Sequence, residues 1–246
     1  MPGPFAAMPG PFADFTDTRR WTRHGTTQLI SETAGLGEAA LAAPSALPGW
    51  TRRHLVAHLA ANAEALGNLV HWAATGEPTA MYSSPGERAA GIERGSLLPR
   101  AELMAWLGRS AAALERAMTA LSDAQWQTPV VSAQGRTIAA AEVPWLRARE
   151  VYVHVVDLAT GLSFSDLPGG FLTALCGDVI ARRGTAPGPA MLLQAIDTGG
   201  RWELPGDGDT VTLSGPLAEI TAYLTGRPHK LATAGGDPAP TLGPWL

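Results

Sequence analysis

The chain has 246 residues, of which 46% are apolar, so it can bury a full hydrophobic core in one large domain or two modest ones. Its formal net charge of −4 at pH 7 provides no basic field, which argues against nucleic acid or an anionic membrane surface as a partner. No apolar run approaches the ~20 residues of a transmembrane helix and the N-terminus lacks the layout of a signal peptide, so we expect a cytoplasmic protein. We also expect it to be a monomer.

The chain begins with a duplicated hexapeptide that is rich in proline and glycine. Met-Pro-Gly-Pro-Phe-Ala occurs at residues 1–6 and again at residues 8–13. This composition predicts a disordered leader over residues 1–13. From Asp14 to Leu41 the apolar spacing predicts a helix, with two glycines as weak points.

A second helix is predicted from Thr51, which suits an N-cap, to about Thr75, where Gly76 stops it. Its core stripe consists of apolar residues at helical spacing, namely Leu55, Leu59, Leu66 and Val70. His54 and His58 lie on the neighbouring stripe, at the edge of the core. An H-x₃-H pair is a weak signal when it stands alone, because such histidines more often face solvent or make hydrogen bonds than bind a metal.

Residues 81–95 read as a longer loop that borders a site. A third helix is predicted over residues 99–121, where tryptophan, leucine and methionine at helical spacing are most simply core. Residues 130–137 predict a turn or short hairpin. This hairpin leads into the stretch that carries the strongest chemical signal.

That stretch, Arg149–Asp157, places Glu150 and His154 inside an otherwise apolar run. A buried carboxylate needs a cation, a hydrogen-bond network or a metal. The alternating valines would suit a strand, but four residues along a strand span ~13 Å, whereas on a helix their Cβ atoms lie about 6 Å apart. A shared metal ion therefore requires a helix, and Pro144 favours one in its first turn. We predict a helix over residues 139–161.

The long helices before residue 161 predict a four-helix bundle over residues 14–163. Helix then strands then helix afterwards predicts a small α+β domain over residues 164–246. Its expected elements are a helix over 167–183, strands over 190–197, 202–204 and 210–214, and a helix over 216–225. The expected fold is thus mainly α with a small α+β part.

A bundle can bring the second and fourth helices side by side, so that the H-x₃-H and E-x₃-H pairs converge. Two imidazole nitrogens and one carboxylate oxygen make a tripod of the catalytic-zinc type, with an open position for water or substrate. The residues alone do not decide which histidine of the first pair takes part. The alternative is a buried Glu150 that pairs with Arg147 or Arg149 without any metal.

Cys176 is the only cysteine, which excludes an internal disulfide and a cysteine-based zinc site. It lies in the apolar run of residues 171–176, where a buried small side chain is the simplest interpretation. If thiol chemistry occurs in this protein, we expect the thiol to come from outside.

Four segments together resemble the mycothiol-dependent maleylpyruvate isomerases. These segments are Leu47–His58, Thr75–Tyr82, Ser132–Thr137 and Arg149–Leu158, and the likeness spans about Asp14 to Leu246. That family resembles the DinB-like metal-binding four-helix bundles, followed by a small C-terminal α/β domain. The duplicated leader and Ala80, where relatives often carry proline, depart from the family pattern without touching the metal motifs.

The resemblance implies a set of site residues and a reaction. By motif, His58, Glu150 and His154 are the metal ligands with zinc as the ion, His54 is a neighbour, and Arg227 after the last helix is a catalytic candidate. The implied cofactor besides zinc is mycothiol, a low-molecular-weight thiol, and the implied substrate is a small dicarboxylate. The reaction is cis-to-trans isomerisation of maleylpyruvate to fumarylpyruvate in gentisate breakdown.

Three other functions remain open from the sequence. A zinc-dependent mycothiol S-transferase acting on another electrophile would carry the same metal ligands, and only the substrate pocket distinguishes it. A non-catalytic metal-binding regulatory module would have a closed coordination sphere and no need for Arg227. A purely structural bundle would bind no metal.

Overall fold

The computed structural model describes residues 13–184, 188–243 and 245. The chain divides into two compact units, one over Asp14–Gly161 and one that begins at Leu162. That the two units are independent domains, divided after residue 163, stays a prediction. The predicted disordered leader falls on residues that lie outside the described part of the chain, except for Ala13.

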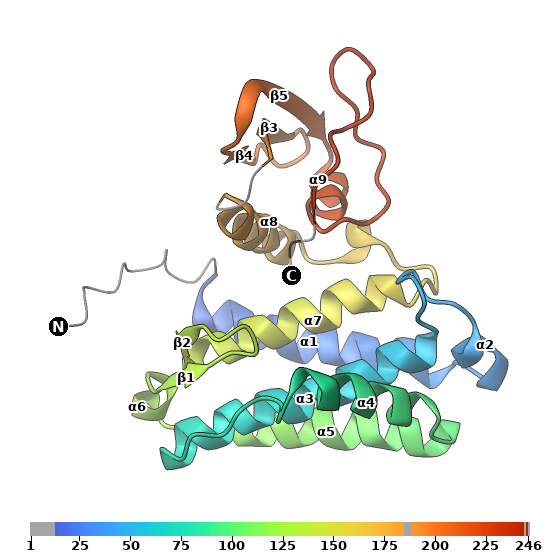
Figure 1. The fold of residues 1–246 in the computed structure, drawn as a ribbon, viewed down its shortest axis with the longest axis vertical. Helices are drawn as coiled ribbons and strands as arrows, with labels where there is room; N and C mark the ends of the chain where they lie inside the picture. The colour runs from blue at the N-terminus through green and yellow to red at the C-terminus, as the bar shows by residue number, and fades with distance from the viewer. Residues whose placement is uncertain (1–12, 185–187, 244, 246) are drawn as a thin grey trace. The chain divides into compact units, whose positions relative to one another are not determined.

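The first unit is a bundle of long helices, as predicted. They are α1 (Phe15–Ala34), α3 (Arg52–Thr75), α5 (Arg100–Ala120) and α7 (Val143–Asp157). Helix α1 packs along α7, and α3 packs along α5 and against α7 (Figure 1). Its shorter elements are α2 (Glu38–Ala42), α6 (Asp123–Trp126), β1 (Pro129–Val131), β2 (Thr137–Ala139) and the 3₁₀ turn η1 (Ala140–Glu142).

Helix α3 confirms the predicted bounds and core stripe. Thr51 is its N-cap, and the chain leaves the helix at Gly76 with φ of +78°, a conformation that glycine adopts without strain. The predicted stripe residues are all at most 1% exposed: Leu55, Leu59, Leu66 and Val70. The stripe therefore fixes which face of α3 turns toward the other helices.

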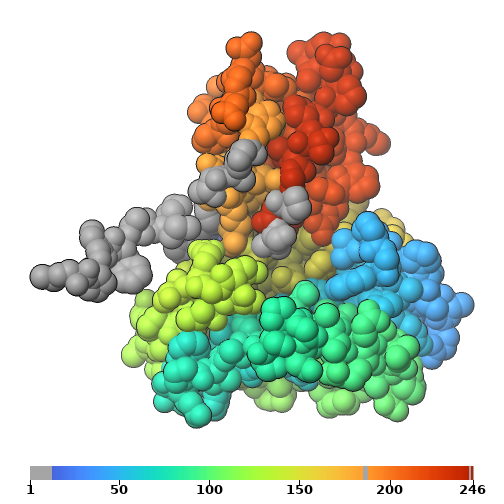
Figure 2. Space-filling model, in the orientation of Figure 1, coloured from blue at the N-terminus to red at the C-terminus, as the bar shows by residue number. Residues whose placement is uncertain are grey.

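The expectation of a loop over residues 81–95 is wrong, because most of it forms helix α4 (Pro85–Ser96). The hydroxyl oxygen of Ser84 accepts a hydrogen bond from the Glu87 backbone N–H, and Pro85 occupies the first turn. Helix α4 packs on α3 and lies on the surface of the bundle (Figure 2). The first predicted helix is also interrupted, since α1 ends at Ala34 and α2 begins only at Glu38.

Helix α7 confirms that the stretch of residues 149–157 is helical. It begins at Val143 with Pro144 in its first turn and ends at Asp157, so it is shorter than the predicted span of residues 139–161. After it, Ala159 has a positive φ of 52°. Arg52, at the start of α3, donates hydrogen bonds from its guanidinium to the backbone carbonyls of Leu158 and Ala159.

The second unit combines helices with a small three-stranded sheet, as predicted. The strands are β3 (Pro189–Ala195), β4 (Arg201–Leu204) and β5 (Asp207–Gly215), in the order β4-β3-β5. Strand β3 is antiparallel to β4 and parallel to β5. The 3₁₀ turn η2 (Phe164–Asp166) and helices α8 (Gly169–Arg183) and α9 (Leu217–Leu224) complete the unit. None of the described helices is long and apolar enough to cross a membrane.

Candidate metal centre

His58 of α3 and Glu150 and His154 of α7 converge inside the first unit. One ligand atom from each side chain lies within 4.8 Å of the others. His58 Nε2 is 3.0 Å from Glu150 Oε2, and His154 Nε2 is 3.5 Å from the same oxygen. Among the residues that the structure describes, it is the one group of three such side chains. The sequence motifs thus meet as the helical spacing predicted.

The centre is mostly buried, and two of its three side chains are partly exposed. The side chain of His58 is 5% exposed, whereas those of Glu150 and His154 are 18% and 15% exposed. A structural metal site is usually closed, while a catalytic one keeps a position open to water or substrate. The partial exposure fits the second kind.

Glu150 is held in its ionised form by the two histidines. Burial alone would raise the pKa of its carboxyl group, but the hydrogen bonds from His154 and His58 outweigh burial and hold the pKa well below its usual value. An ionised carboxylate is the form that binds a metal cation. The immediate surroundings of Glu150 therefore favour that form.

Asp157 orients His154. Its Oδ2 lies 2.8 Å from Nδ1 of His154, and the aspartate is fully buried at the end of α7. Burial lowers the pKa of His154, but the hydrogen bonds to Asp157 and Glu150 raise it to about 8. With Nδ1–H donating to this carboxylate, Nε2 is the nitrogen that would bind a metal, and it would lose its proton to do so, as in carboxylate–histidine–zinc arrangements.

His58 has a different environment. Burial lowers the pKa of its imidazole, against the opposing effect of the hydrogen bond to Glu150. The neutral ring that this favours is the metal-binding form. Its Nδ1 lies 3.4 Å from Nη2 of Arg88, on α4. The Arg88 guanidinium also lies over the ring of Tyr82, 5.8 Å from its centroid, and burial raises the pKa of Tyr82.

Sequence reasoning expected residues 81–95 to border a site, but it read them as a loop and did not single out Arg88. The available signal was Ser84-Pro85, since serine before proline is a typical helix start. It would have predicted α4, although not its packing against His58.

His54 has a structural role at the start of α3. Its Nδ1 accepts a hydrogen bond from the Thr51 backbone N–H at 3.2 Å and lies 2.7 Å from the Thr51 hydroxyl. The two residues form a capping box, which satisfies donors that the first helical turn leaves open. His54 Nε2 faces Glu93 at 3.5 Å. Only His58 of the H-x₃-H pair joins the three-residue group.

The arginines weighed from the sequence occupy separate environments. Arg147 donates from Nη1 to the Leu59 carbonyl and to Asn62 Oδ1, both at 2.8 Å, while Glu150 hydrogen bonds with the histidines. Arg149 is buried at 4% exposure. Arg227 belongs to the second unit and follows Gly226, which has φ of +72°. Its Nη1 donates to the Thr225 carbonyl at 2.5 Å.

The donor set fits a zinc ion. Two imidazole nitrogens and one carboxylate oxygen are the protein ligands of a common type of catalytic zinc site, and all three come from rigid helices. The two ligands on α7 are four residues apart, and the third lies on the neighbouring helix α3. The arrangement can therefore hold a divalent cation with part of its coordination sphere open.

Comparisons with known proteins agree with this architecture. A family model described as the mycothiol maleylpyruvate isomerase N-terminal domain matches residues 22–159. A crystal structure of the mycothiol-dependent maleylpyruvate isomerase shares 34% sequence identity, covering 94% of this chain and 97% of that chain, with a TM-score of 0.89. A histidine-to-alanine mutant of such an isomerase matches with the same identity and coverage and a TM-score of 0.88.

A more distant structure shares the fold alone. YfiT from Bacillus subtilis, described as a probable metal-dependent hydrolase with an unusual four-helix bundle topology, is 15% identical, covers 65% of this chain and 90% of its own, and has a TM-score of 0.51. No curated protein sequence matches significantly. The predicted fold class, a DinB-like four-helix bundle followed by a small α/β part, is confirmed. From the family match and the 34% identity over nearly the whole length, the chain belongs to the mycothiol maleylpyruvate isomerase family.

Proposed function

We propose that this protein is a mycothiol-dependent cis–trans isomerase that converts maleylpyruvate to fumarylpyruvate, and that His58, Glu150 and His154 hold one zinc ion in its active site. The observation that carries the proposal is the convergence of these three side chains within 4.8 Å. It is supported by the 34% identity to a mycothiol-dependent maleylpyruvate isomerase over 94% of the chain.

The reaction needs a temporary loss of double-bond character, because a carbon–carbon double bond does not rotate freely. Conjugate addition of a thiolate achieves this: a carbon–sulfur bond forms, the π electrons move into an enolate, and the remaining single bond rotates. When the electrons return, the trans double bond forms and the thiolate leaves, so no atom is gained or lost. A zinc ion bound by the three side chains would lower the pKa of a coordinated thiol, so that the thiolate exists at neutral pH.

The protein's own thiol is unsuitable for this role. Cys176 is fully buried in the second unit, and its Sγ lies 3.3 Å from the hydroxyl of Thr221. Burial raises the pKa of the Cys176 thiol to about 12, so that it stays protonated at neutral pH. A thiol supplied from outside, for which mycothiol is the candidate, is therefore required by the proposed chemistry.

The protein side chains prepare the site and balance charge. Asp157 keeps the His154 proton on Nδ1, and Glu150 stays ionised between the two imidazoles. The substrate is a dianion that gains enolate charge during the reaction, so a nearby cation should stabilise the transition state. Arg88 lies beside His58 in the first unit. We assign the direct contact with substrate to Arg227, by its motif.

The proposal is tested by incubating the zinc-loaded protein with maleylpyruvate, with and without mycothiol, and following the trans product by chromatography. We expect the product only when mycothiol is present. Absence of turnover with the thiol present would overturn the isomerase assignment. A stable thioether in place of the trans product would indicate the S-transferase, and bound zinc without any reaction would indicate the regulatory module.

A further inference from the structure

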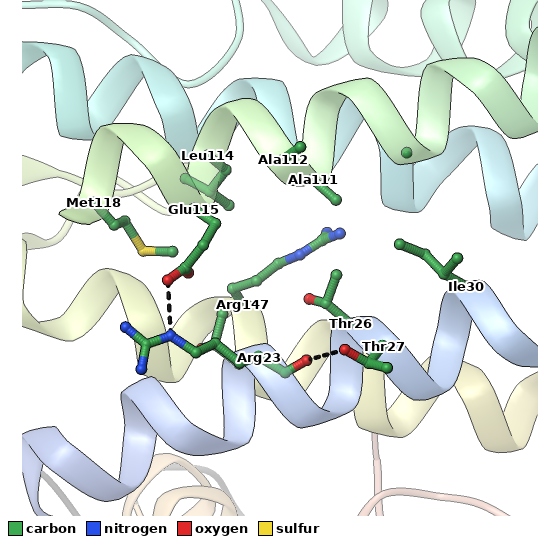
Figure 3. Close-up of a pocket in the computed structure, with 12 residues that line it drawn as sticks. Arg23, Thr26, Thr27, Ile30, Ala111, Ala112, Leu114, Glu115, Met118 and Arg147 are labelled. Atoms are coloured by element: carbon green, nitrogen blue, oxygen red, sulfur yellow. Dashed lines mark hydrogen bonds and ion pairs between the residues drawn. The ribbon is translucent and has the colours of Figure 1, made fainter. Parts of the chain in front are cut away.

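The first unit contains a cavity whose lining includes none of the three proposed ligands. It has a volume of about 220 Å³ and is lined by α1, α5 and one residue of α7, Arg147 (Figure 3). The proposed metal ligands lie on α3 and α7, whereas this cavity opens between α1 and α5. Its volume is below the roughly 300–1,000 Å³ of pockets that take drug-sized ligands, so it suits a smaller molecule.

The Arg147 side chain extends from α7 into this cavity, and its guanidinium group lies between Ala111 of α5 and Thr26 of α1 in the close-up (Figure 3). The whole residue is 1% exposed. Nη1 is satisfied by the Leu59 carbonyl and Asn62 Oδ1 on α3. Nε and Nη2 are buried and make no hydrogen bond within the described residues.

These two nitrogens form one edge of the planar guanidinium, and their N–H bonds point the same way. That edge matches the two oxygens of a carboxylate, which arginine binds in bidentate geometry. A buried donor without a partner destabilises the folded chain, and a charged donor does so more strongly, so an occupant that accepts both hydrogen bonds would be stabilising.

No carboxylate of the cavity wall takes this place. Glu115, the one acidic lining residue, is paired with Arg19 at 2.9 Å and with Arg23 at 2.8 Å. Burial lowers the pKa of Arg147 to about 10, against the attraction of Glu150 and Tyr82, so the group still carries its charge at neutral pH. The cavity therefore contains a buried positive charge whose free edge lacks an anionic partner among the described residues.

The rest of the wall favours an apolar tail. Half of the lining residues are apolar or lack a polar side chain, namely Ile30, Gly108, Ala111, Ala112, Leu114 and Met118. The hydroxyl of Thr22 is already committed to the carbonyls of Thr18 and Pro144. We propose that this cavity binds a small organic carboxylate with a short aliphatic chain, with its carboxylate on the Nε–Nη2 edge of Arg147. The proposal does not depend on the isomerase function.

The test uses butyrate and its uncharged counterpart butyramide, at equal ionic strength, with the full-length protein. Isothermal titration calorimetry measures the affinity, and the Nε–H resonance of Arg147 in a ¹⁵N-edited NMR spectrum reports on the proposed contact. We expect butyrate to bind at least tenfold more tightly than butyramide and to shift that resonance. Equal binding of the two compounds, or no binding of butyrate at millimolar concentrations, would overturn the proposal.

Two variants test separately the contribution of the Arg147 charge and that of the cavity volume. Arg147→Met removes the guanidinium and keeps the bulk, while Ala111→Leu keeps Arg147 and fills the cavity from α5. Both should lose butyrate binding by at least tenfold. Ala113→Leu, at an exposed position of the same helix outside the cavity, is the matched control and should bind butyrate like the native protein. Retained binding in Ala111→Leu would contradict the proposed location even if Arg147→Met does not fold.

Discussion

His54 and His58 lie one turn apart on the same helix, and their different partners lead to opposite expectations on substitution. His58→Ala removes a proposed ligand, so we expect bound zinc to fall from about one ion per chain to none. His54→Ala removes a capping-box contact, so it should lower the free energy of unfolding by about 1 kcal/mol and keep the metal. Atomic emission spectrometry and chemical denaturation measure the two quantities. Equal zinc loss in both variants would contradict the ligand assignment.

Cys176 should make stability fall at alkaline pH. Its pKa is about 12 in the folded protein against 9.0 for a free thiol, so its contribution to stability is complete below pH 9 and is lost as the pH rises toward 12. Denaturation at pH 8 and pH 10.5 should show the native protein losing up to ~1.4 kcal/mol per pH unit above 9 relative to Cys176→Ala. Parallel losses in the two proteins would exclude this role of the thiol.

Arg227 is the candidate for substrate contact, and the expected effect of its removal is on catalysis. Arg227→Ala should bind zinc normally and lose at least a hundredfold in kcat/KM for maleylpyruvate, because a cation that stabilises developing negative charge is missing. Lys230→Ala, which removes a cation from an exposed nearby position, is the control and should stay active. An active Arg227→Ala enzyme would remove Arg227 from the proposed mechanism.

At the scale of elements, α1 and α7 lie close together at Gly25. A Cβ atom there would lie 2.6 Å from Cγ2 of Val151 and 3.2 Å from Cε1 of Tyr152. Gly25→Ala should therefore destabilise the protein by about 1–3 kcal/mol through overpacking. Since Val151 follows Glu150 on α7, the same change should weaken zinc binding.

Gly67 supplies the control for this prediction. It lies within α3, and a Cβ atom there would meet nothing within 4 Å. Gly67→Ala should be stabilising by about 0.5–1 kcal/mol, because alanine favours the helix. Thermal unfolding monitored by circular dichroism compares the two variants. A stable Gly25→Ala protein would mean that α1 and α7 can separate at little cost.

The elements also differ in how well sequence predicted them. Helix α3 was predicted from Thr51 to Thr75 because a cap, an apolar stripe and a terminal glycine agree. Helix α4 was missed because its alanine, glycine and charged residues show little apolar periodicity. Its position in the bundle depends instead on packing against α3. Local signals locate elements that carry their own core stripe, whereas tertiary contacts decide the others.

At the scale of the whole molecule, the proposed metal links distant parts of the chain. His58 is separated from Glu150 by 92 positions, so an ion bound by both favours the folded state over the unfolded chain. At a free zinc concentration of 100 times the dissociation constant, the stabilisation would be about 2.7 kcal/mol. Thermal unfolding with zinc and with excess chelator should show a higher midpoint in zinc. An unchanged midpoint would mean that these side chains hold no ion in the folded state.

The candidate site was partly predictable for the same reason. Helical spacing placed Glu150 and His154 on one face, and the bundle brought α3 beside α7. The sequence alone did not distinguish His54 from His58 as the metal ligand, because the two are the first and last residues of the same H-x₃-H motif. They differ because of their distance from the helix terminus. His54 lies in the first turn of α3 and hydrogen bonds with Thr51 in the capping box, whereas His58 lies one turn later and contacts Glu150 of α7. That distinction needs the folded chain, as does the packing of Arg88 against His58.

The hydrogen bonds from Arg52 to the carbonyls that follow α7 have a consequence for the ions that the site could accept. Arg52 begins the helix that carries His58, and it holds the carbonyls of Leu158 and Ala159, just after the helix that carries His154. These hydrogen bonds join the two helices without involving a ligand atom, and they oppose sliding of one helix past the other. An incoming cation would meet donors whose separation is already set, so little conformational entropy would be lost on binding. Discrimination among divalent ions would then depend on how well each ion's radius fits that fixed separation.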